Sequence, residues 1–166
     1  IMALIALARI DDRLVHGQVV TKWVQRTKSN HIIIVDDTLA QNSFLADVYK
    51  MAAPVGVTVS VKSTKQAADE WKENQFGDGT VLLLFKNPQN VQKACENGIH
   101  IESLQVAGMG SASGKKVVYK TVSLSEDDAQ VLQKFSQQGI HVYFQALPED
   151  KPTDIGFILK KHFKNL

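Results

Sequence analysis

Two runs of consecutive apolar residues constrain the fold more strongly than any other feature of this chain. They read HIIIVD at 31–36 and TVLLLF at 80–85, and neither alternates with polar residues. A strand with one buried face alternates, whereas a strand covered on both faces, as in a parallel sheet, is apolar throughout. Both runs are much shorter than the roughly 18 residues that a membrane-spanning helix needs. We therefore expect inner strands of a sheet that is covered by helices.

Apolar stripes with helical spacing separate these runs from other strand-like segments. The expected strands are 3–10, 31–36, 57–62, 80–85, 102–107, 116–124 and 140–145. The expected helices cover 18–28, 44–52 and about 154–163, and three more begin after Ser63, Asn87 and Ser125. Because the loop 108–114 is too short for a crossover helix, we expect 116–124 to run antiparallel to 102–107. This order predicts an α/β fold, an open doubly wound, mostly parallel twisted sheet of about seven strands with one antiparallel strand and helices on both faces.

Composition limits the class of protein further. The chain has 166 residues, of which 44% are hydrophobic, and it contains no repeat or linker that would divide it, so we expect a single domain over 1–166. Cys95 is the only cysteine, which excludes disulfide frameworks and thiolate metal clusters. A net charge of +2 argues against nucleic acid as a partner. Residues 1–8 lack the basic leader of a signal peptide, so we expect a cytoplasmic protein.

One segment concentrates the groups that carry chemistry. Ligands of doubly wound sheets bind outside the carboxyl ends of the strands, which directs attention to 11–17, 36–43, 86–87, 107–114 and 146–153. The first of these, with the end of the preceding strand, reads RIDDRLVHGQ at 9–18. The chain has 16 lysines but only three arginines, and two of those, Arg9 and Arg13, lie in this stretch. This placement points to a role that lysine does not fill.

The residue types in this segment suit a phosphoryl group. A helix N-terminus attracts anions through its free N–H groups, and arginine presents a planar fork to phosphate oxygens. Histidine can act as a nucleophile near neutral pH, and Gly17 allows the backbone to approach a ligand closely. We infer that His16 is positioned to carry or to attack a phosphoryl group. The other four histidines have no such surroundings and are read as ordinary residues; they are His31, His100, His141 and His162.

Other phosphate and metal chemistries fit less well. A dinucleotide site needs G-x-G-x-x-G after the first strand, where this chain has only Gly17. A receiver domain would use the acidic pair at 11–12, but it needs an aspartate after the third strand, where the chain reads VKST at 61–64. A metal site could draw on the same pair, His16 and either Asp36 or Asp37, but the nearby arginines would repel a dication. A phosphate-binding regulatory module without transfer and a metal-dependent hydrolase remain as alternatives.

The same segment carries a family resemblance. ARIDDRLVHGQVVTKW at 8–23 closely resembles the signature loop of the IIB subunit of the mannose/fructose/sorbose family of the bacterial sugar phosphotransferase system. The resemblance extends over nearly the whole chain, through IIIVDDTLAQNSF, KMAAPVGVTVSV, LFKNPQNVQKACENGI and KKVVYKTVSLSEDD. One departure is QVAGM at 105–109, where the family often has N-x-G-G-M. An active-site role for the following loop is therefore left open.

The resemblance implies a function and a set of partners. Such a IIB subunit accepts a phosphoryl group from a histidine of the IIA protein, which is charged by the phosphocarrier HPr. It carries the group on Nδ1 of its own histidine and passes it to the sugar as the membrane subunits IIC and IID move the sugar inward. The chain would then be a phosphotransferase without a cofactor or metal, cytoplasmic and peripherally associated with the membrane complex. Neither the sugar nor the oligomeric state follows from the sequence.

Site residues follow by position. His16 matches the phosphoacceptor, Arg13 the arginine of the same loop and Arg9 the arginine just before it, and we expect both arginines to neutralise phosphoryl oxygens. Backbone N–H groups at 16–18, which include Gly17 and Gln18, are expected to add to this. Asp11 or Asp12 would orient an arginine or the second imidazole nitrogen, and Asp37 could do the same from a neighbouring loop.

Overall fold

The computed structural model describes residues 3–166 and contains nine strands and seven helices within that range. The strands are β1 (Leu4–Asp11), β2 (His31–Val35), β3 (Thr58–Lys62), β4 (Thr80–Phe85), β5 (Ser103–Gly108), β6 (Lys116–Tyr119), β7 (Val122–Leu124), β8 (His141–Phe144) and β9 (Thr153–Asp154). The helices are α1 (Gly17–Thr27), α2 (Asp37–Ala40), α3 (Ser43–Met51), α4 (Thr64–Asn74), α5 (Pro88–Glu96), α6 (Glu126–Gln137) and α7 (Ile155–His162). Residues 1 and 2, the start of the segment that we read as lacking a signal peptide, lie outside this range.

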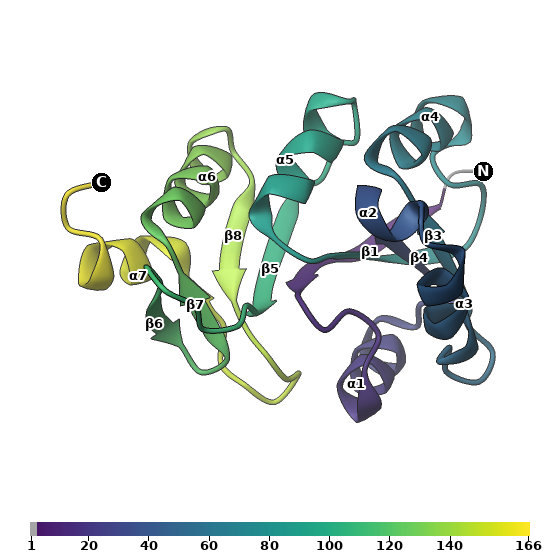
Figure 1. The fold of residues 1–166 in the computed structure, drawn as a ribbon, viewed down its shortest axis with the longest axis horizontal. Coiled ribbons are helices and arrows are strands. Elements are labelled where there is room, and N and C mark those ends of the chain that lie inside the picture. Colours follow the sequence, from purple (N-terminus) through teal and green to yellow (C-terminus); the bar gives the residue numbers. More distant parts are fainter. Residues whose placement is uncertain (1–2) are drawn as a thin grey trace.

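Seven of the strands form one sheet in the order β3-β2-β4-β1-β5-β8-β9. Every neighbouring pair is parallel except β8 and β9, which are antiparallel. In Figure 1, helices α4, α5 and α6 lie above the sheet and α1 lies below it. The predicted fold class is therefore confirmed.

The identity of the antiparallel strand was predicted wrongly. The segment 116–124 is not one strand beside β5, because a turn at Lys120 and Thr121 divides it into β6 and β7. These two strands pair with each other as a separate two-stranded sheet, and only a single parallel bridge, from Met109 to Val122, joins them to the end of β5. The antiparallel neighbour in the main sheet is β9, which reaches β8 after the chain turns back at 145–152. A short loop indicates that a crossover helix is missing, but it does not show where the chain pairs next.

Two hydrophobic layers explain the apolar runs. Along β2, Ile32 and Ile34 belong to a cluster with α1 and α2, whereas Ile33 and Val35 belong to a second cluster with α4, α5, α6 and α7. All four side chains have no exposed surface. Burying a side chain of this size contributes about 1.5–3 kcal/mol, so a polar residue at any of these positions would be costly.

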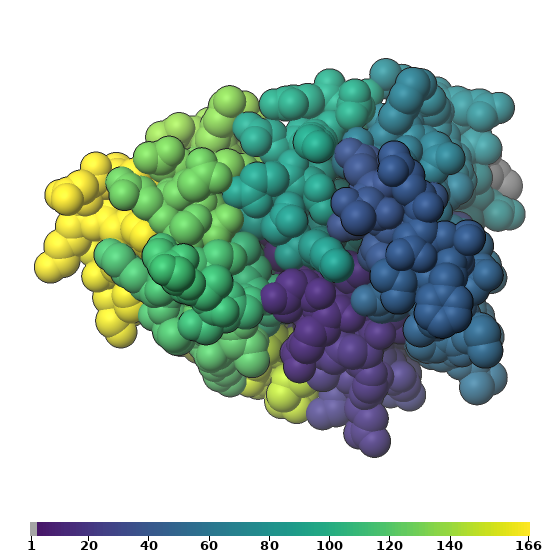
Figure 2. All heavy atoms as spheres, viewed as in Figure 1, coloured from purple at the N-terminus to yellow at the C-terminus, as the bar shows by residue number. Residues whose placement is uncertain are grey.

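The sheet changes its winding direction between β1 and β5. These strands are neighbours, but the chain leaves β1 through α1 toward β2 on one side, and leaves β5 toward β8 on the other. At such a switch point the two departing loops separate and leave room for a ligand. The loop 12–16, which follows β1, therefore lies beside the loop 109–115, which follows β5. In Figure 2 the purple atoms of the first loop reach the surface next to green atoms from the middle of the chain.

Candidate functional site

Asp11, the last residue of β1, is the centre of the site. Its side chain has no exposed surface, yet both carboxylate oxygens accept hydrogen bonds. Oδ2 accepts from Nη2 of Arg9 at 3.2 Å and from Nε2 of His16 at 2.9 Å. Oδ1 accepts from the backbone N–H of Arg13 at 3.1 Å and lies 3.6 Å from Nε of the same residue. One buried carboxylate thus contacts Arg9, Arg13 and His16, the three residues that the sequence analysis matched to the family's active site.

The loop between Asp11 and His16 is held by its own backbone. The N–H of Leu14 donates to the carbonyl oxygen of Asp11 at 2.9 Å, and Leu14 has a φ of 56°. A positive φ is unfavourable for a branched residue and costs on the order of 1 kcal/mol. The side chain of Leu14 is completely buried in the hydrophobic layer beside Val15 and Val20. Burial of this one side chain therefore offsets the strain and fixes the course of the loop.

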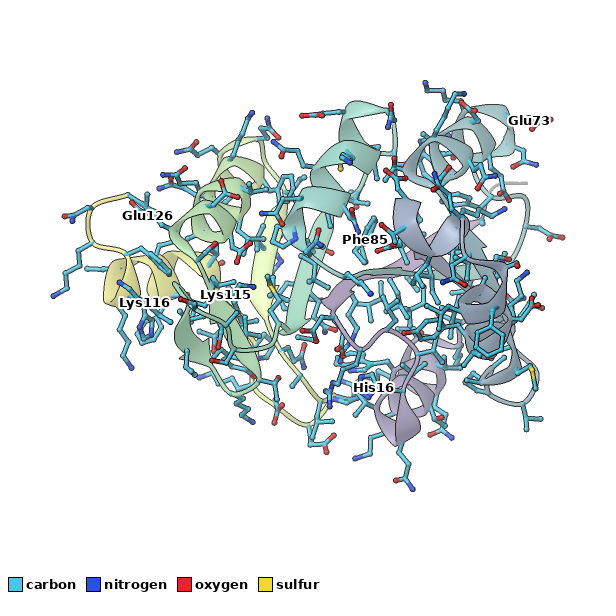
Figure 3. The ribbon with its side chains drawn as sticks, viewed as in Figure 1. His16, Glu73, Phe85, Lys115, Lys116 and Glu126 are labelled. Atoms are coloured by element: carbon cyan, nitrogen blue, oxygen red, sulfur yellow. The ribbon has the colours of Figure 1, made fainter. Side chains whose placement is uncertain are left out.

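The contact with Asp11 defines the protonation of the His16 ring. A carboxylate can only accept a hydrogen bond, so Nε2 of His16 carries the proton. In the neutral ring, Nδ1 then holds the lone pair, and it has no hydrogen-bond partner among residues 3–166. The side chain is 20% exposed, which is enough for a small group to reach it. Figure 3 shows His16 at the start of α1, on the side away from the helices α4 to α6. This geometry leaves Nδ1 with the chemistry that a nucleophile needs, a lone pair without a hydrogen-bond partner among the described residues.

Asp11 stays ionised because its partners outweigh its burial. Burial by itself raises the pKa of this carboxyl, but the hydrogen bond from His16 and the charge of Arg9 lower it, with a further contribution from the Arg13 N–H. Together these partners hold the pKa of Asp11 below its usual value. A negative charge beneath the imidazole also stabilises the positive charge that the ring gains when Nδ1 forms a fourth bond.

The first turn of α1 has features that suit an anion. His16 is the N-cap residue of this helix but makes no capping hydrogen bond with its side chain, and the first turn contains no acidic residue. The first N–H groups of a helix have no partner within the helix, and the N-terminus carries a partial positive charge. Gly17 and Gln18 are exposed there, and the side chain of Arg13, in the loop just before the helix, is 56% exposed. These groups can surround the oxygens of a phosphoryl group on Nδ1.

Arg9 does not lie where we expected it. We expected its guanidinium to contact phosphoryl oxygens, but it is only 1% exposed and lies beneath Asp11. Its Nη1 donates to the side chain of Gln105 and to the carbonyl oxygen of Ala146, and its Cζ lies 5.5 Å from the ring centre of Trp23. Arg9 can therefore affect His16 only through Asp11.

Sequence reasoning missed Gln105 and the partners around it. Gln105 is completely buried in β5 and also donates to Oε1 of Gln145 at 3.3 Å. The signal was a glutamine within an otherwise apolar strand, since a buried polar group is retained only with partners. Trp23 is buried, and its Nε1–H donates to the same Ala146 carbonyl at 2.9 Å.

The end of β5 and the loop after it lie against the end of β1 and the first loop. Gly108 is buried against Asp11, and a Cβ atom there would lie 2.7 Å from Oδ1 of Asp11. Asp12 is exposed and accepts a hydrogen bond from the backbone N–H of Gly110 at 2.6 Å. The sequence did not decide whether Asp11 or Asp12 orients the imidazole or an arginine. In the structure Asp11 contacts both His16 and Arg9, whereas Asp12 joins the two loops.

Asp37 belongs to a different set of contacts. It accepts hydrogen bonds from the backbone N–H and the hydroxyl of Thr64 at 2.7 and 3.0 Å, and Lys93 lies 3.6 Å away. The hydrogen bond from the Thr64 N–H lowers the pKa of Asp37, against the opposing effect of burial. Asp36 accepts from the Leu39 N–H and from Asn90. The carboxylates that a metal site would need together with His16 are thus directed to other partners.

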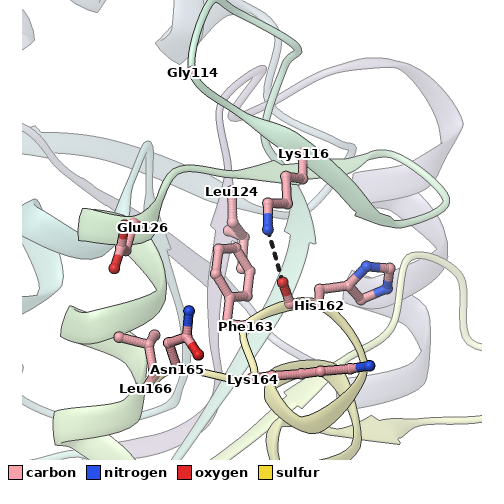
Figure 4. A pocket seen from close by; sticks show the side chains of 9 residues that line it. All are labelled: Gly114, Lys116, Leu124, Glu126, His162, Phe163, Lys164, Asn165 and Leu166. Carbon is pink, nitrogen blue, oxygen red and sulfur yellow. Dashed lines mark hydrogen bonds between the residues drawn. The ribbon is translucent and has the colours of Figure 1, made fainter.

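A cavity lies far from the cluster around Asp11. This cavity of about 200 Å³ is formed where α7 and the C-terminal residues meet β6 and the start of α6. Nζ of Lys116 donates to the carbonyl oxygen of His162 at 2.9 Å across it, as Figure 4 shows. Figure 3 places Lys116 and Glu126 toward the left end of the molecule, away from His16 at its lower edge. None of the predicted site residues lines this cavity.

The fold and the site define a doubly wound α/β protein in which an imidazole, hydrogen-bonded to a buried carboxylate, lies at the switch point of the sheet. The family model described as "PTS system sorbose subfamily IIB component" matches residues 5–166. The chain is 32% identical to the fructose-specific EIIB component of Bacillus subtilis, over 94% of this chain and 96% of the relative. It is 35% identical to the mannose-specific EIIAB component of Escherichia coli K12, covering 95% of this chain but only 49% of that relative. The crystal structure of the IIBSor domain of the Klebsiella pneumoniae sorbose permease superposes with a TM-score of 0.90 at 33% identity, covering 96% of this chain and 98% of that one.

The chain therefore belongs to the sorbose-type IIB family of the sugar phosphotransferase system (PTS), which confirms the family predicted from the signature loop. It is a phosphotransferase component that acts in phosphoryl transfer coupled to sugar transport. Nothing in the fold or the comparisons favours the regulatory module or the hydrolase. Among residues 3–166, no helix has both the length and the apolar character that crossing a membrane requires.

Proposed function

We propose that this chain carries a phosphoryl group on Nδ1 of His16, taken from a phosphohistidine of a IIA protein and passed on to a sugar. The observation that carries the proposal is the hydrogen bond from Nε2 of His16 to the buried Asp11, which leaves the Nδ1 lone pair free at the surface. It supports Nδ1 of His16, and no other ring nitrogen, as the proposed nucleophile.

The transfer is a displacement at phosphorus between two imidazoles. The Nδ1 lone pair of His16 forms the new N–P bond as the bond between phosphorus and the donor nitrogen breaks, and that electron pair returns to the donor ring. No proton has to leave His16, because its proton is on Nε2 and remains bonded to Asp11. The protein therefore contributes positioning and charge stabilisation rather than covalent work. Arg13 and the N–H groups of Gly17 and Gln18 neutralise the phosphoryl oxygens, and Arg9 holds Asp11 in place.

The partners follow from the family and from the exposed position of His16. The donor is a IIA protein or domain charged by HPr, and the mannose-specific relative is named as a fused EIIAB component. The acceptor is a sugar bound by the IIC and IID membrane subunits, so the chain works at the cytoplasmic face of the transporter. The names of the relatives include fructose, mannose and sorbose, and the sugar of this chain is left open.

Labelling with phosphorylated IIA tests the proposal. We expect the wild-type chain to take up acid-labile label and His16→Ala to take up none. His100→Ala is the matched control, because that histidine is exposed and lies outside the cluster, and it should be labelled like the wild type. Nitrogen NMR of the labelled protein should place phosphorus on Nδ1. Label on another residue, or on Nε2 of His16, would overturn the proposal.

A further inference from the structure

Helix α3 and the turn after it expose an unusual amount of apolar surface. Of the eight large hydrophobic side chains that are exposed among residues 3–166, five lie within 44–55. Phe44 is 75% exposed, Met51 is 85% exposed and Val55 is fully exposed, with Val48 and Leu45 between them. Isolated exposed apolar residues are ordinary, but a contiguous group of them marks an interaction surface. These five side chains form one patch, whereas the other three exposed hydrophobic side chains lie in separate parts of the chain.

The patch is not the face with which α3 packs on the sheet. Ala46 is buried, and Tyr49 and Ala53 pack against the hydrophobic layer, so they form the inner face. Phe44, Val48 and Met51 follow at intervals of four and three residues on the outer face. A helix that is apolar on two faces is built to be covered on both. In Figure 2 the dark blue atoms of this region form part of the outer surface on the right.

The charges beside the patch select the kind of partner. Asp47 and Lys50 lie on the same side of the apolar stripe and are 3.8 Å apart. Their charges cancel, so the surface has no basic excess that would attract an anionic membrane. If a second copy of α3 packs antiparallel across a two-fold axis, the charged side of each helix lies next to the charged side of the other, and the two helices run in opposite directions. Asp47 of each copy then lies opposite Lys50 of the other, which gives two equivalent ion pairs.

We propose that two copies of this chain associate through the outer faces of their α3 helices, antiparallel and related by a two-fold axis. Intervals of four and three residues form the seam of paired helices, in which side chains of one helix fit between those of the other. Val48 lies near the axis, and Phe44 lies against Met51 and Val55 of the second copy. An isologous interface of this kind is complementary to itself. Because α3 has only nine residues, we expect a weak dimer with a Kd on the order of 100 μM.

Sedimentation equilibrium over a range of concentrations tests the association. Phe44→Glu and Met51→Lys should each abolish the dimer, because either one places a charge in the apolar seam. Both variants keep the helix stable, since an anion in the first turn and a cation in the last turn suit its dipole. Phe157→Glu on α7 is the matched control, because it replaces another exposed apolar side chain, 61% exposed, and should dimerise like the wild type. A wild-type chain that remains monomeric up to about 1 mM would overturn the proposal.

Charge reversal tests the antiparallel arrangement. Asp47→Lys and Lys50→Asp should each weaken the dimer by about three- to tenfold, although one raises and the other lowers the net charge. The double variant restores opposite charges across the axis and should regain wild-type affinity. A double variant that stays as weak as the single variants would show that these side chains do not face each other, and the proposed interface would be wrong.

Discussion

Nε2 of His16 lies 2.9 Å from Oδ2 of Asp11, a carboxylate with no exposed surface. This contact aligns the imidazole, holds its proton on Nε2 and leaves the lone pair on Nδ1. Burial raises the pKa of Asp11, but the hydrogen bond from His16, the charge of Arg9 and the backbone N–H of Arg13 together hold this pKa below its usual value. The reactivity expected of His16 therefore depends on a residue five positions earlier in the chain.

Replacing Asp11 by asparagine should slow phosphoryl acceptance by about a hundredfold or more, as expected when the group that orients a reactive histidine is lost. The amide can donate to Nε2, which favours the tautomer with its proton on Nδ1 and removes the nucleophilic lone pair. The rate of labelling by phosphorylated IIA measures the loss, and nitrogen NMR reports the tautomer. Asp12→Asn is the control and should change the rate by less than about threefold. If the two variants behave alike, Asp11 does not orient the ring.

The pKa of Asp11 also predicts how stability depends on pH. Because this pKa is lowered in the folded chain, the ionised carboxylate stabilises the fold at every pH above the ordinary value of about 3.9. That contribution is lost as the pH falls through the lower folded pKa. The free energy of unfolding in urea should therefore be higher for the wild type than for Asp11→Asn at pH 7, and the gap should narrow below about pH 4. Other carboxyl groups affect both proteins equally, so a gap that stays constant would contradict the assignment.

Gly108→Ala should impair the site although Gly108 ends a different strand, β5. Its new Cβ would come within 2.7 Å of Oδ1 of Asp11, which is held from all sides. The carboxylate must shift, so we expect a loss of stability of about 1–3 kcal/mol and labelling slowed by about tenfold or more. Gly110→Ala is the matched control, because its Cβ would meet only the exposed Asp12 side chain at 3.1 Å, which can move away. Thermal unfolding and labelling rates are compared between the two variants. Equal effects would show that the close approach of Gly108 to Asp11 is not needed for the site.

Arg13→Lys should slow transfer and leave folding intact. The side chain is 56% exposed, so its replacement disturbs little packing. An ammonium group cannot form the bidentate contact of a guanidinium with phosphoryl oxygens, and we expect a loss of about tenfold in the labelling rate. Arg26→Lys, on the exposed surface of the same α1 helix, should have no effect. An unchanged rate in Arg13→Lys would reduce this arginine to an ordinary surface charge.

Much of the fold could be predicted from local patterns. The run 80–85 became β4 without a change of limits, and Ser63 and Ser125 cap their helices as their spacing predicted. Such features depend on residues close together in the sequence. The pairing of β6 with β7 and of β9 with β8 did not follow, because both depend on where a loop returns the chain to an existing edge. The short helix α2 was also missed, although Asp36 caps it in the usual way.

The candidate site divides in the same manner. The sequence by itself determined that a histidine, two arginines and an acidic pair meet at the carboxyl end of the first strand, because those residues are neighbours along the chain. Only the tertiary structure decided that Asp11 contacts the imidazole, that Arg9 supports it from below, and that Gln105 and Gly108 complete its surroundings. The physical reason is that β5 lies beside β1 through a sheet whose order the local sequence does not encode. Burial and hydrogen bonding across that pair of strands decide which of several charged neighbours becomes part of the site.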